Sequence, residues 1–169
     1  LDGAFTLLPA ETGFGPGVTS RHMLISAARA ATLKLANQRE AALPEAPVLI
    51  RGADPFDLAS ARALADPALD LANPLKGPFV AEPLEQVVAA QAAMELALLA
   101  GILPAFLVDP APASEAQELS AADLTAWKDT ANLAIATRAH LPVRAAEQAE
   151  IVAFRSADDL REHVALIIG

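Results

Sequence analysis

Three histidines and a Ser-Arg-His run are the residues of this chain whose types could do chemistry. His22, His140 and His163 lie far apart and have no second ligand at helical or hairpin spacing, so they do not predict a zinc site. Ser20, Arg21 and His22 bring a hydroxyl, a guanidinium and an imidazole together. Because adjacent residues of a strand point to opposite faces, this run does not predict a Ser-His nucleophile pair.

A glycine-rich run, GFGPG at residues 13–17, has backbone N–H groups that could cradle a phosphate. It matches neither G-x-G-x-x-G nor the P-loop, and no Lys-Ser or Lys-Thr pair follows, so a plain turn is favoured. The loose acidic series Asp54, Asp57, Asp66 and Asp70 is interpreted as helix caps and dipole partners. We therefore assign no catalytic, cofactor-binding or metal-binding residue, and expect no cofactor in this chain.

The composition limits the classes of function. A chain of 169 residues with 54% hydrophobic residues is long enough and apolar enough for a folded core. The net charge of -9 disfavours nucleic acid and anionic membrane as partners, and no window is apolar enough to span a membrane. Because the chain has no cysteine, disulfides, thiolate metal sites and Cys nucleophiles are excluded, and a cytoplasmic location is favoured.

The elements that must position these residues follow from apolar runs and from caps. Helices are expected over 27–43 (capped by Ser26 and broken near Asn37), over 55–65 (capped by Asp54) and over 83–100, closed by Gly101. In the third helix, Leu84, Val87, Val88, Met94 and Leu98 recur at helical spacing. Strands are expected at 4–9, 22–25, 46–52 and 102–108, and a mostly irregular segment at 65–83. The predicted fold class is α/β, a helix-covered mixed sheet.

A second part follows a Pro/Ala/acidic linker at 109–118. Ser120 and Asp123 form a capping box for a short helix, whose apolar face is expected to bury Trp127. The runs at 134–143, 150–154 and 163–168 predict three strands, with Ile135 and Thr137 on one side of the first. The sheet is therefore followed by a short helix and the start of an antiparallel β meander.

Several of these segments resemble a known family. Residues 137–169, with AHLP at 139–142 and HVALIIG at 163–169, resemble the opening of the GTP cyclohydrolase II domain of riboflavin biosynthesis. Upstream, ATLKLANQREAA, APVLI, LADPALDLANPLKGPF and LLAGILPAFLV are similar to the amino-terminal domain that precedes the cyclohydrolase domain in a bacterial subset.

The resemblance implies that the chain is the non-catalytic amino-terminal part of a GTP cyclohydrolase II-like enzyme. Such an enzyme opens the purine ring of GTP and releases formate and pyrophosphate, with zinc activating water. Residues 1–112 would be an amino-terminal module, 113–133 a linker and bridging helix, and 134–169 a truncated start of the catalytic domain. The family's zinc ligands and catalytic residues fall on no position of this chain. GTP as the partner of the full-length enzyme and a homodimer are implied as well.

Two alternatives remain open. The chain could be a self-contained interaction or regulatory domain that shares only the fold. It could also be a degenerate dihydroxybutanone phosphate synthase-like domain. That activity depends on an acidic loop of the form D-x-E-x-R-E-N-E-G-D, whereas the first 40 residues here hold only Asp2, Glu11 and Glu40 as acids.

Overall fold

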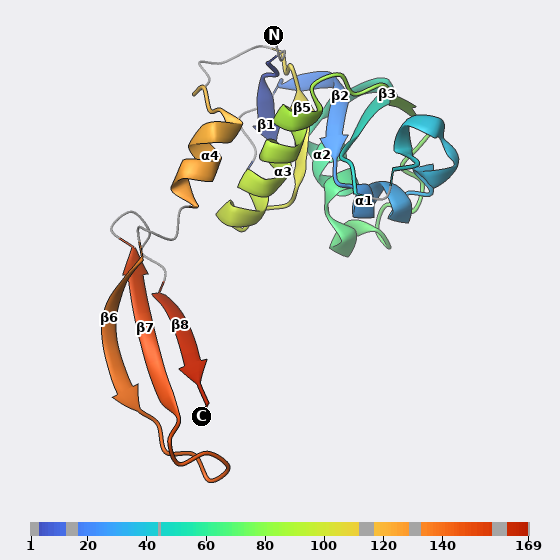
Figure 1. Cartoon of the computed structure of the whole chain (residues 1–169). Coiled ribbons are helices and arrows are strands. Elements are labelled where there is room, and N and C mark those ends of the chain that lie inside the picture. The colour runs from blue at the N-terminus through green and yellow to red at the C-terminus, as the bar shows by residue number, and fades with distance from the viewer. Residues whose placement is uncertain are drawn as a thin grey trace. The chain divides into compact units, whose positions relative to one another are not determined.

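The computed structural model describes residues 4–12, 17–43, 45–111, 117–128, 133–156 and 162–168. The chain divides into two compact units, Leu1–Leu124 and Thr125–Gly169, hereafter unit 1 and unit 2 (Figure 1). The strands of unit 1 are β1 (Leu7–Pro9), β2 (Thr19–Ile25), β3 (Val48–Asp57), β4 (Phe79–Glu82) and β5 (Ala105–Val108). Its helices are α1 (Ala27–Thr32), α2 (Leu58–Ala65) and α3 (Val87–Ala100), with 3-10 turns η1 (Leu35–Asn37), η2 (Arg39–Ala41) and η3 (Pro67–Leu69). Then come α4 (Ala121–Trp127), which contains the boundary between the two units in the sequence, and β6 (Leu133–His140), β7 (Glu150–Ser156) and β8 (Glu162–Ile167).

The five strands of unit 1 form one sheet in the order β1-β5-β2-β3-β4. Helices cover this sheet, so the predicted α/β class is confirmed. Every pairing between these strands is antiparallel, whereas the sequence had suggested a mixed sheet. Continuous apolar runs are typical of parallel strands buried on both faces. Here both faces of an antiparallel sheet are covered, which produces the same sequence pattern.

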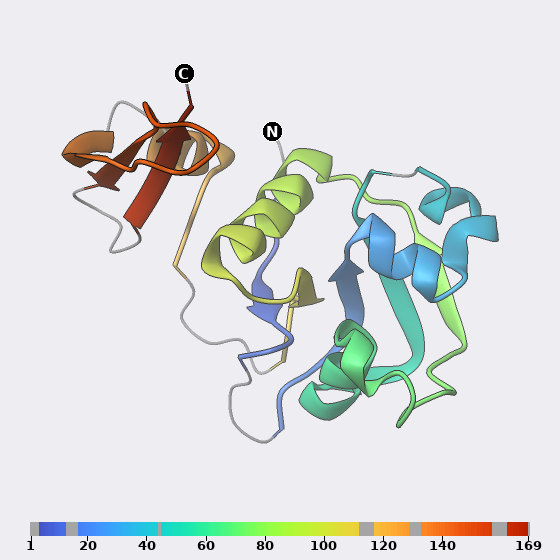
Figure 2. The same cartoon turned by 90° about the horizontal axis from the view of Figure 1, so that it is seen from below.

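The two covered faces carry two separate clusters of buried side chains. On one face, Met23 and Ile50 pack with residues of α1 and α2, among them Leu64. On the other face, Leu24 and Phe106 pack against α3. Figure 2 shows α3 in yellow-green on one side of β2, with α1 in blue and α2 in green on the other. Alternation along β2 therefore supplies both cores from one strand.

The helix predicted over 27–43 is much shorter. Ser26 caps α1 as predicted, since its Oγ accepts a hydrogen bond from the Arg29 N–H at 3.2 Å. The helix ends at Thr32, because Lys34 adopts a left-handed conformation with φ 61° and the chain continues as η1 and η2. A left-handed residue cannot continue a right-handed helix, so the break comes before Asn37.

The helix predicted to start at Pro55 was also placed wrongly. β3 continues to Asp57, and it is Asp57, not Asp54, that caps α2, forming a capping box with Ser60. The pairing of β2 with β3 shifts register between Ser20 and His22, so the β3 residues opposite this point bulge out of the ladder. A proline is tolerated at such a bulge, which explains Pro55 inside a strand.

Gly52 makes this bulge possible. A Cβ atom at Gly52 would lie 2.7 Å from the Asp54 carbonyl oxygen and 2.9 Å from the Phe56 ring. A side chain at position 52 would therefore clash with the Asp54 carbonyl oxygen, so the close approach of the backbone at this point requires glycine.

Two further segments differ in detail from the prediction. The segment 65–83 is not wholly irregular, because β4 forms at Phe79–Glu82 and pairs with β3. α3 ends at Gly101 as predicted (φ 70°), and Met94 is buried, but Val88 and Leu98 are exposed while Ala90, Ala93 and Ala97 face the sheet. Apolar residues occur on all sides of α3, so periodicity could not select its buried face. The small side chains of the buried alanines allow the backbone of α3 to lie closer to the sheet than larger side chains would.

Unit 2 contains the predicted antiparallel meander, in the order β6-β7-β8. A register shift between Ile135 and Thr137 interrupts the alternation expected along β6. The predicted cap of α4 is present, since the Ser120 N–H donates to Asp123 at 2.8 Å and the Asp123 N–H donates to Ser120 Oγ at 3.1 Å. The predicted burial of Trp127 is wrong: 43% of it is exposed, because α4 is a short helix in which Leu124 is the buried residue.

Candidate functional site

Ser20 and His22 lie on β2 but do not form a nucleophile pair. Ser20 is buried, and its Oγ donates a hydrogen bond to the Val108 carbonyl of β5 and accepts one from the His22 N–H at 3.1 Å. The hydroxyl is thus engaged by backbone groups at the register shift, and Arg21 is exposed. The structural role favoured for this run is the one observed.

His22 belongs instead to a polar cluster across three strands. Its Nε2 lies 3.0 Å from Glu82 Oε2 of β4, and Arg51 Nε of β3 donates to the other oxygen of Glu82 at 2.5 Å. The Arg51 guanidinium holds the pKa of Glu82 below its ordinary value. Because both carboxylate oxygens are engaged, Glu82 links β2, β3 and β4 rather than acting as a free base.

No metal site forms from the three histidines. His22 lies on β2, His140 ends β6 and His163 lies on β8, and the last two are exposed. Among the residues described, no group of three or more His, Cys, Asp or Glu side chains could hold a metal ion. Of the glycine-rich run, residues 13–16 lie outside the described residues.

The residues of the acidic series do not share one role. Asp57 caps α2, and Asp66 accepts a hydrogen bond from the Ala68 N–H at 2.8 Å at the start of η3, so the capping interpretation is confirmed for both. Asp54 is exposed. Asp70 is not a cap, because it binds two basic side chains beside a pocket.

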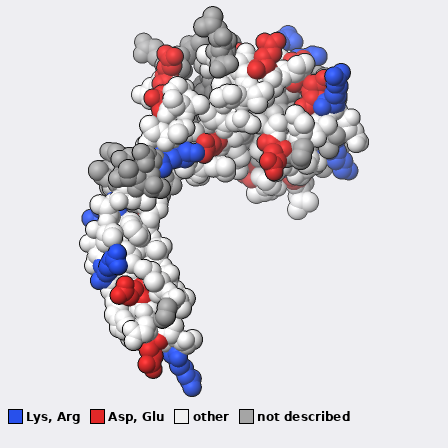
Figure 3. Space-filling view, viewed as in Figure 1, with Lys and Arg blue, Asp and Glu red and all other residues white. Residues whose placement is uncertain are grey.

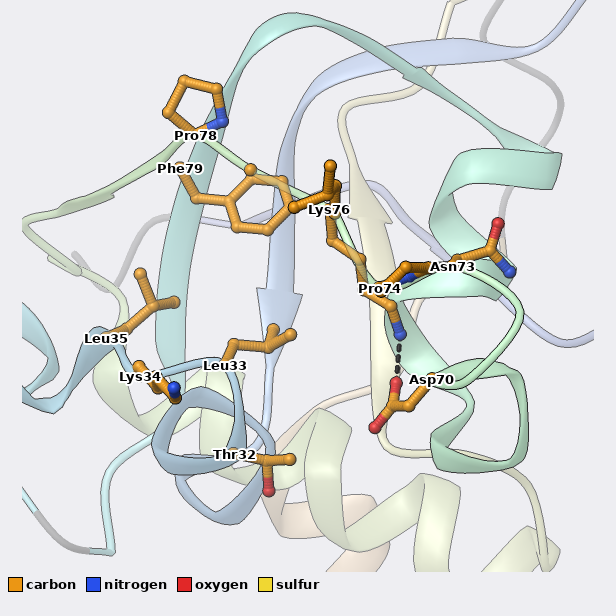
Figure 4. A pocket seen from close by; sticks show the side chains of 12 residues that line it. Thr32, Leu33, Lys34, Leu35, Asp70, Asn73, Pro74, Lys76, Pro78 and Phe79 are labelled. Carbon is orange, nitrogen blue, oxygen red and sulfur yellow. Dashed lines mark hydrogen bonds and ion pairs between the residues drawn. The ribbon is translucent and has the colours of Figure 1, made fainter.

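Unit 1 contains a pocket beside Asp70. It has a volume of 560 Å³, within the range of small-molecule sites. Three segments form its walls: the end of α1 with the turn after it, the loop after η3, and the start of β4. In Figure 4, Leu33, Leu35 and Phe79 lie on one side of the pocket and Lys76 with Asp70 on another. The lining residues are Thr32, Leu33, Lys34, Leu35, Asp70, Asn73, Pro74, Leu75, Lys76, Gly77, Pro78 and Phe79.

Asp70 connects two basic side chains at this pocket. Arg29 donates from both terminal nitrogens to the Asp70 carboxylate, at 2.8 and 2.6 Å, and Lys76 Nζ donates to the same carboxylate. These contacts, with Arg29 the stronger, hold the pKa of Asp70 well below its ordinary range. Arg29 also donates from Nε to the Leu64 carbonyl at 2.6 Å. The network therefore joins α1, α2 and the pocket loop.

A second set of hydrogen bonds fixes the opposite wall. The Gln38 side chain donates to the Phe79 carbonyl at 3.1 Å and accepts from the Ala81 N–H at 2.6 Å. These bonds satisfy backbone groups of β4, the last strand in the sheet order, and hold it beside η1 and η2. The Phe79 ring is further positioned against the Phe56 ring, 6.0 Å away between centroids.

The sequence pattern did not predict the ion pairs that join Arg29 and Lys76 to Asp70. Arg29 occurs in an alanine-rich helix, and Asp70 and Lys76 occur in a proline-rich segment interpreted as irregular. The available signal was Lys76, which lies between Pro74 and Pro78. Prolines restrict the backbone on either side of such a loop residue, which indicates an ordered loop rather than a flexible one.

Unit 2 presents a different feature, an exposed apolar surface. Val164 and Leu166 of β8, and Ile168 directly after this strand, are 53–67% exposed. Ile135 and Ile167 are exposed as well. Figure 3 shows acidic and basic side chains on the meander as well as on unit 1, with uncharged surface between them. Large exposed aliphatic side chains at this density are typical of surfaces that another chain or segment covers.

Comparisons with known proteins give no relative. No family model matches the chain, and neither a curated protein nor a solved structure is significantly similar to it. Among the described residues, no helix is long and apolar enough to cross a membrane.

Proposed function

We propose that this chain is the non-catalytic amino-terminal part of a cytoplasmic, homodimeric GTP cyclohydrolase II-like protein of riboflavin biosynthesis. Unit 1 serves as a structural or regulatory module, and the meander of unit 2 begins the sheet of the catalytic domain. GTP and zinc belong to that catalytic domain. The chemistry there is zinc-assisted hydrolysis, in which the metal makes hydroxide available near neutral pH.

The observation that carries the proposal is the position of the AHLP and HVALIIG motifs. AHLP, at 139–142, begins in the last residues of β6, and HVALIIG, at 163–169, includes most of β8. The two motifs therefore flank β7 in one antiparallel meander, which supports the proposal.

The apolar surface of β8 supports a continuation of this sheet. Val164, Leu166 and Ile168 are large aliphatic side chains left exposed on and next to β8, and a sheet with such side chains gains stability when another element covers them. Burial of each such side chain is worth about 1.5–3 kcal/mol. The catalytic domain is the partner that we propose for this face.

This proposal predicts weak protection of β8. In the 169-residue chain as a dilute monomer, the backbone amides of β8 are expected to exchange with solvent much faster than those of β2, because β8 lacks its cover. Hydrogen exchange followed by NMR on one sample provides the measurement, and β2 serves as the internal control. Strong protection throughout His163–Ile167 in a strict monomer would contradict the proposal, since the sheet would then be complete without further cover.

The enzymatic part of the proposal is tested on the native gene product. Purified with its natural flanking sequence, it is expected to contain stoichiometric zinc and to release formate and pyrophosphate from GTP. The 169-residue chain alone is expected to do neither, because it has no cysteine to supply thiolate ligands. Metal analysis and a formate assay on both proteins make the comparison. A native product without zinc or formate release would refute the proposal, and stoichiometric zinc in the 169-residue chain would show that the metal site was wrongly assigned to the catalytic domain.

A further inference from the structure

We propose that the pocket beside β4 is a binding site for a phosphate monoester with a compact apolar body. Lys76 and Lys34 hold the phosphate, and the apolar body lies against Leu33, Leu35 and Phe79. The inference goes beyond the proposed function: it concerns unit 1 alone and stands whatever reaction the native protein performs.

Positive charge is in excess beside the pocket. Arg29 and Lys76 are only 6% and 10% exposed, and both bind the single carboxylate of Asp70. An ammonium group has three N–H donors, and Asp70 is the partner of Lys76 among the residues that the structure describes. The ammonium group of Lys76 therefore has two further donors with which it can bind an anion in the pocket that it lines. The pocket is where that anion would lie.

A further cation lies at the rim of the pocket. Lys34 lines the same pocket and is exposed. It occupies a left-handed conformation (φ 61°) in the turn after α1, which places it at the rim of the pocket. Counting Lys34, the described residues in and directly behind the pocket include three cations, Arg29, Lys34 and Lys76, whereas Asp70 is the one carboxylate among the lining residues. A phosphate monoester, which carries close to two negative charges near neutral pH, balances that excess, whereas a carboxylate balances only half of it.

The shape of the pocket and its apolar wall suit an anion that carries an apolar group. Opposite the charged wall, Leu33, Leu35 and Phe79 form an apolar wall, and the volume of 560 Å³ admits a molecule of the size of an aryl phosphate. The chain as a whole carries a net charge of -9, which repels anions in general. Saturable binding of an anion by this protein therefore requires a local site such as this one.

Phenyl phosphate is the probe for the test, and amide NMR spectra of the labelled 169-residue chain provide the readout. Saturable shifts are expected at Lys34, Lys76 and Phe79. Inorganic phosphate lacks the apolar body, and benzyl alcohol lacks the charge, so both are expected to bind more weakly. No saturable shift at the pocket residues would overturn the proposal, and tighter binding of phenylacetate than of phenyl phosphate would overturn the choice of a phosphate.

The three lysines of the chain provide the test variants and their control. Lys76→Met is expected to weaken phenyl phosphate binding about tenfold or more, because a charge-assisted hydrogen bond is lost while the aliphatic stem is kept. Lys34→Met should weaken binding without touching the buried network, and it remains informative if Lys76→Met does not fold. Lys128→Met, which lies outside the pocket, should bind as the original chain does. Unchanged affinity in both Lys34→Met and Lys76→Met would overturn the proposal.

Discussion

Replacing Leu107 with alanine is expected to lower the free energy of unfolding of unit 1 by about 3 kcal/mol. Leu107 is fully buried on β5, where its backbone pairs with Leu8 of β1 and Met23 of β2. The substitution removes its aliphatic side chain from the core shared with α1 and α2, and β-sheet neighbours cannot close the resulting cavity without breaking the register. Urea unfolding followed by far-ultraviolet circular dichroism measures the change.

A matched control comes from the same unit. Leu71 is 96% exposed, so Leu71→Ala removes the same atoms from a side chain that buries almost no surface. Its expected change in stability is within about 0.5 kcal/mol. If both variants lost similar stability, the sheet would not be packed around β5 as described.

The central strands could be predicted from the sequence because their signal is local. LLP, HMLI, VLI and AFLV are apolar runs bounded by prolines, glycines or charges, and each occurs in one of the strands β1, β2, β3 and β5. The boundary between β3 and α2 could not be predicted in the same way. Asp54-Pro55 is a good local start for a helix. The long-range pairing of β3 with β2 and the close approach at Gly52 override that local preference.

The pocket network was beyond sequence analysis for a similar reason. Arg29 and Asp70 are separated by 41 positions, and their contact depends on how α1 and the loop after η3 pack on the same face of the sheet. An arginine among alanines predicts a solvated side chain, since charged residues are rarely fully buried unless paired. Only the folded arrangement shows that the pairing exists.

The exposed surface of unit 2 illustrates another limit. Short apolar runs at 150–154 and 163–168, together with alternation at 134–143, predicted the strands of the meander correctly. The same pattern also implies a buried face, yet Val164 and Leu166 are more than half exposed. Periodicity reports which side chains are suited to burial; whether they are buried depends on what packs against them.

Replacing Arg29 with methionine is expected to lower the stability of unit 1 by about 2 kcal/mol at neutral pH, because three hydrogen bonds from a buried guanidinium are lost. The loss is smaller than for a fully buried pair, since Asp70 is about one-third exposed to water. Arg39→Met, at an exposed arginine of η2, is the matched control and should change little.

The pH dependence of stability separates loss of this ion pair from loss of packing. Arg29 and Lys76 lower the folded-state pKa of Asp70 below its unfolded value, near 3.9. The contribution of Asp70 is therefore fully present above that unfolded value and is lost as the pH falls through the folded-state value. In Arg29→Met the folded-state pKa moves back toward the unfolded one, so the variant should lose less stability than the original chain between neutral and acidic pH. Urea titrations of both proteins at a series of acidic pH values measure this difference. Parallel pH profiles for the two proteins would contradict the role assigned to the pair, because a purely packing role for Arg29 predicts a constant offset.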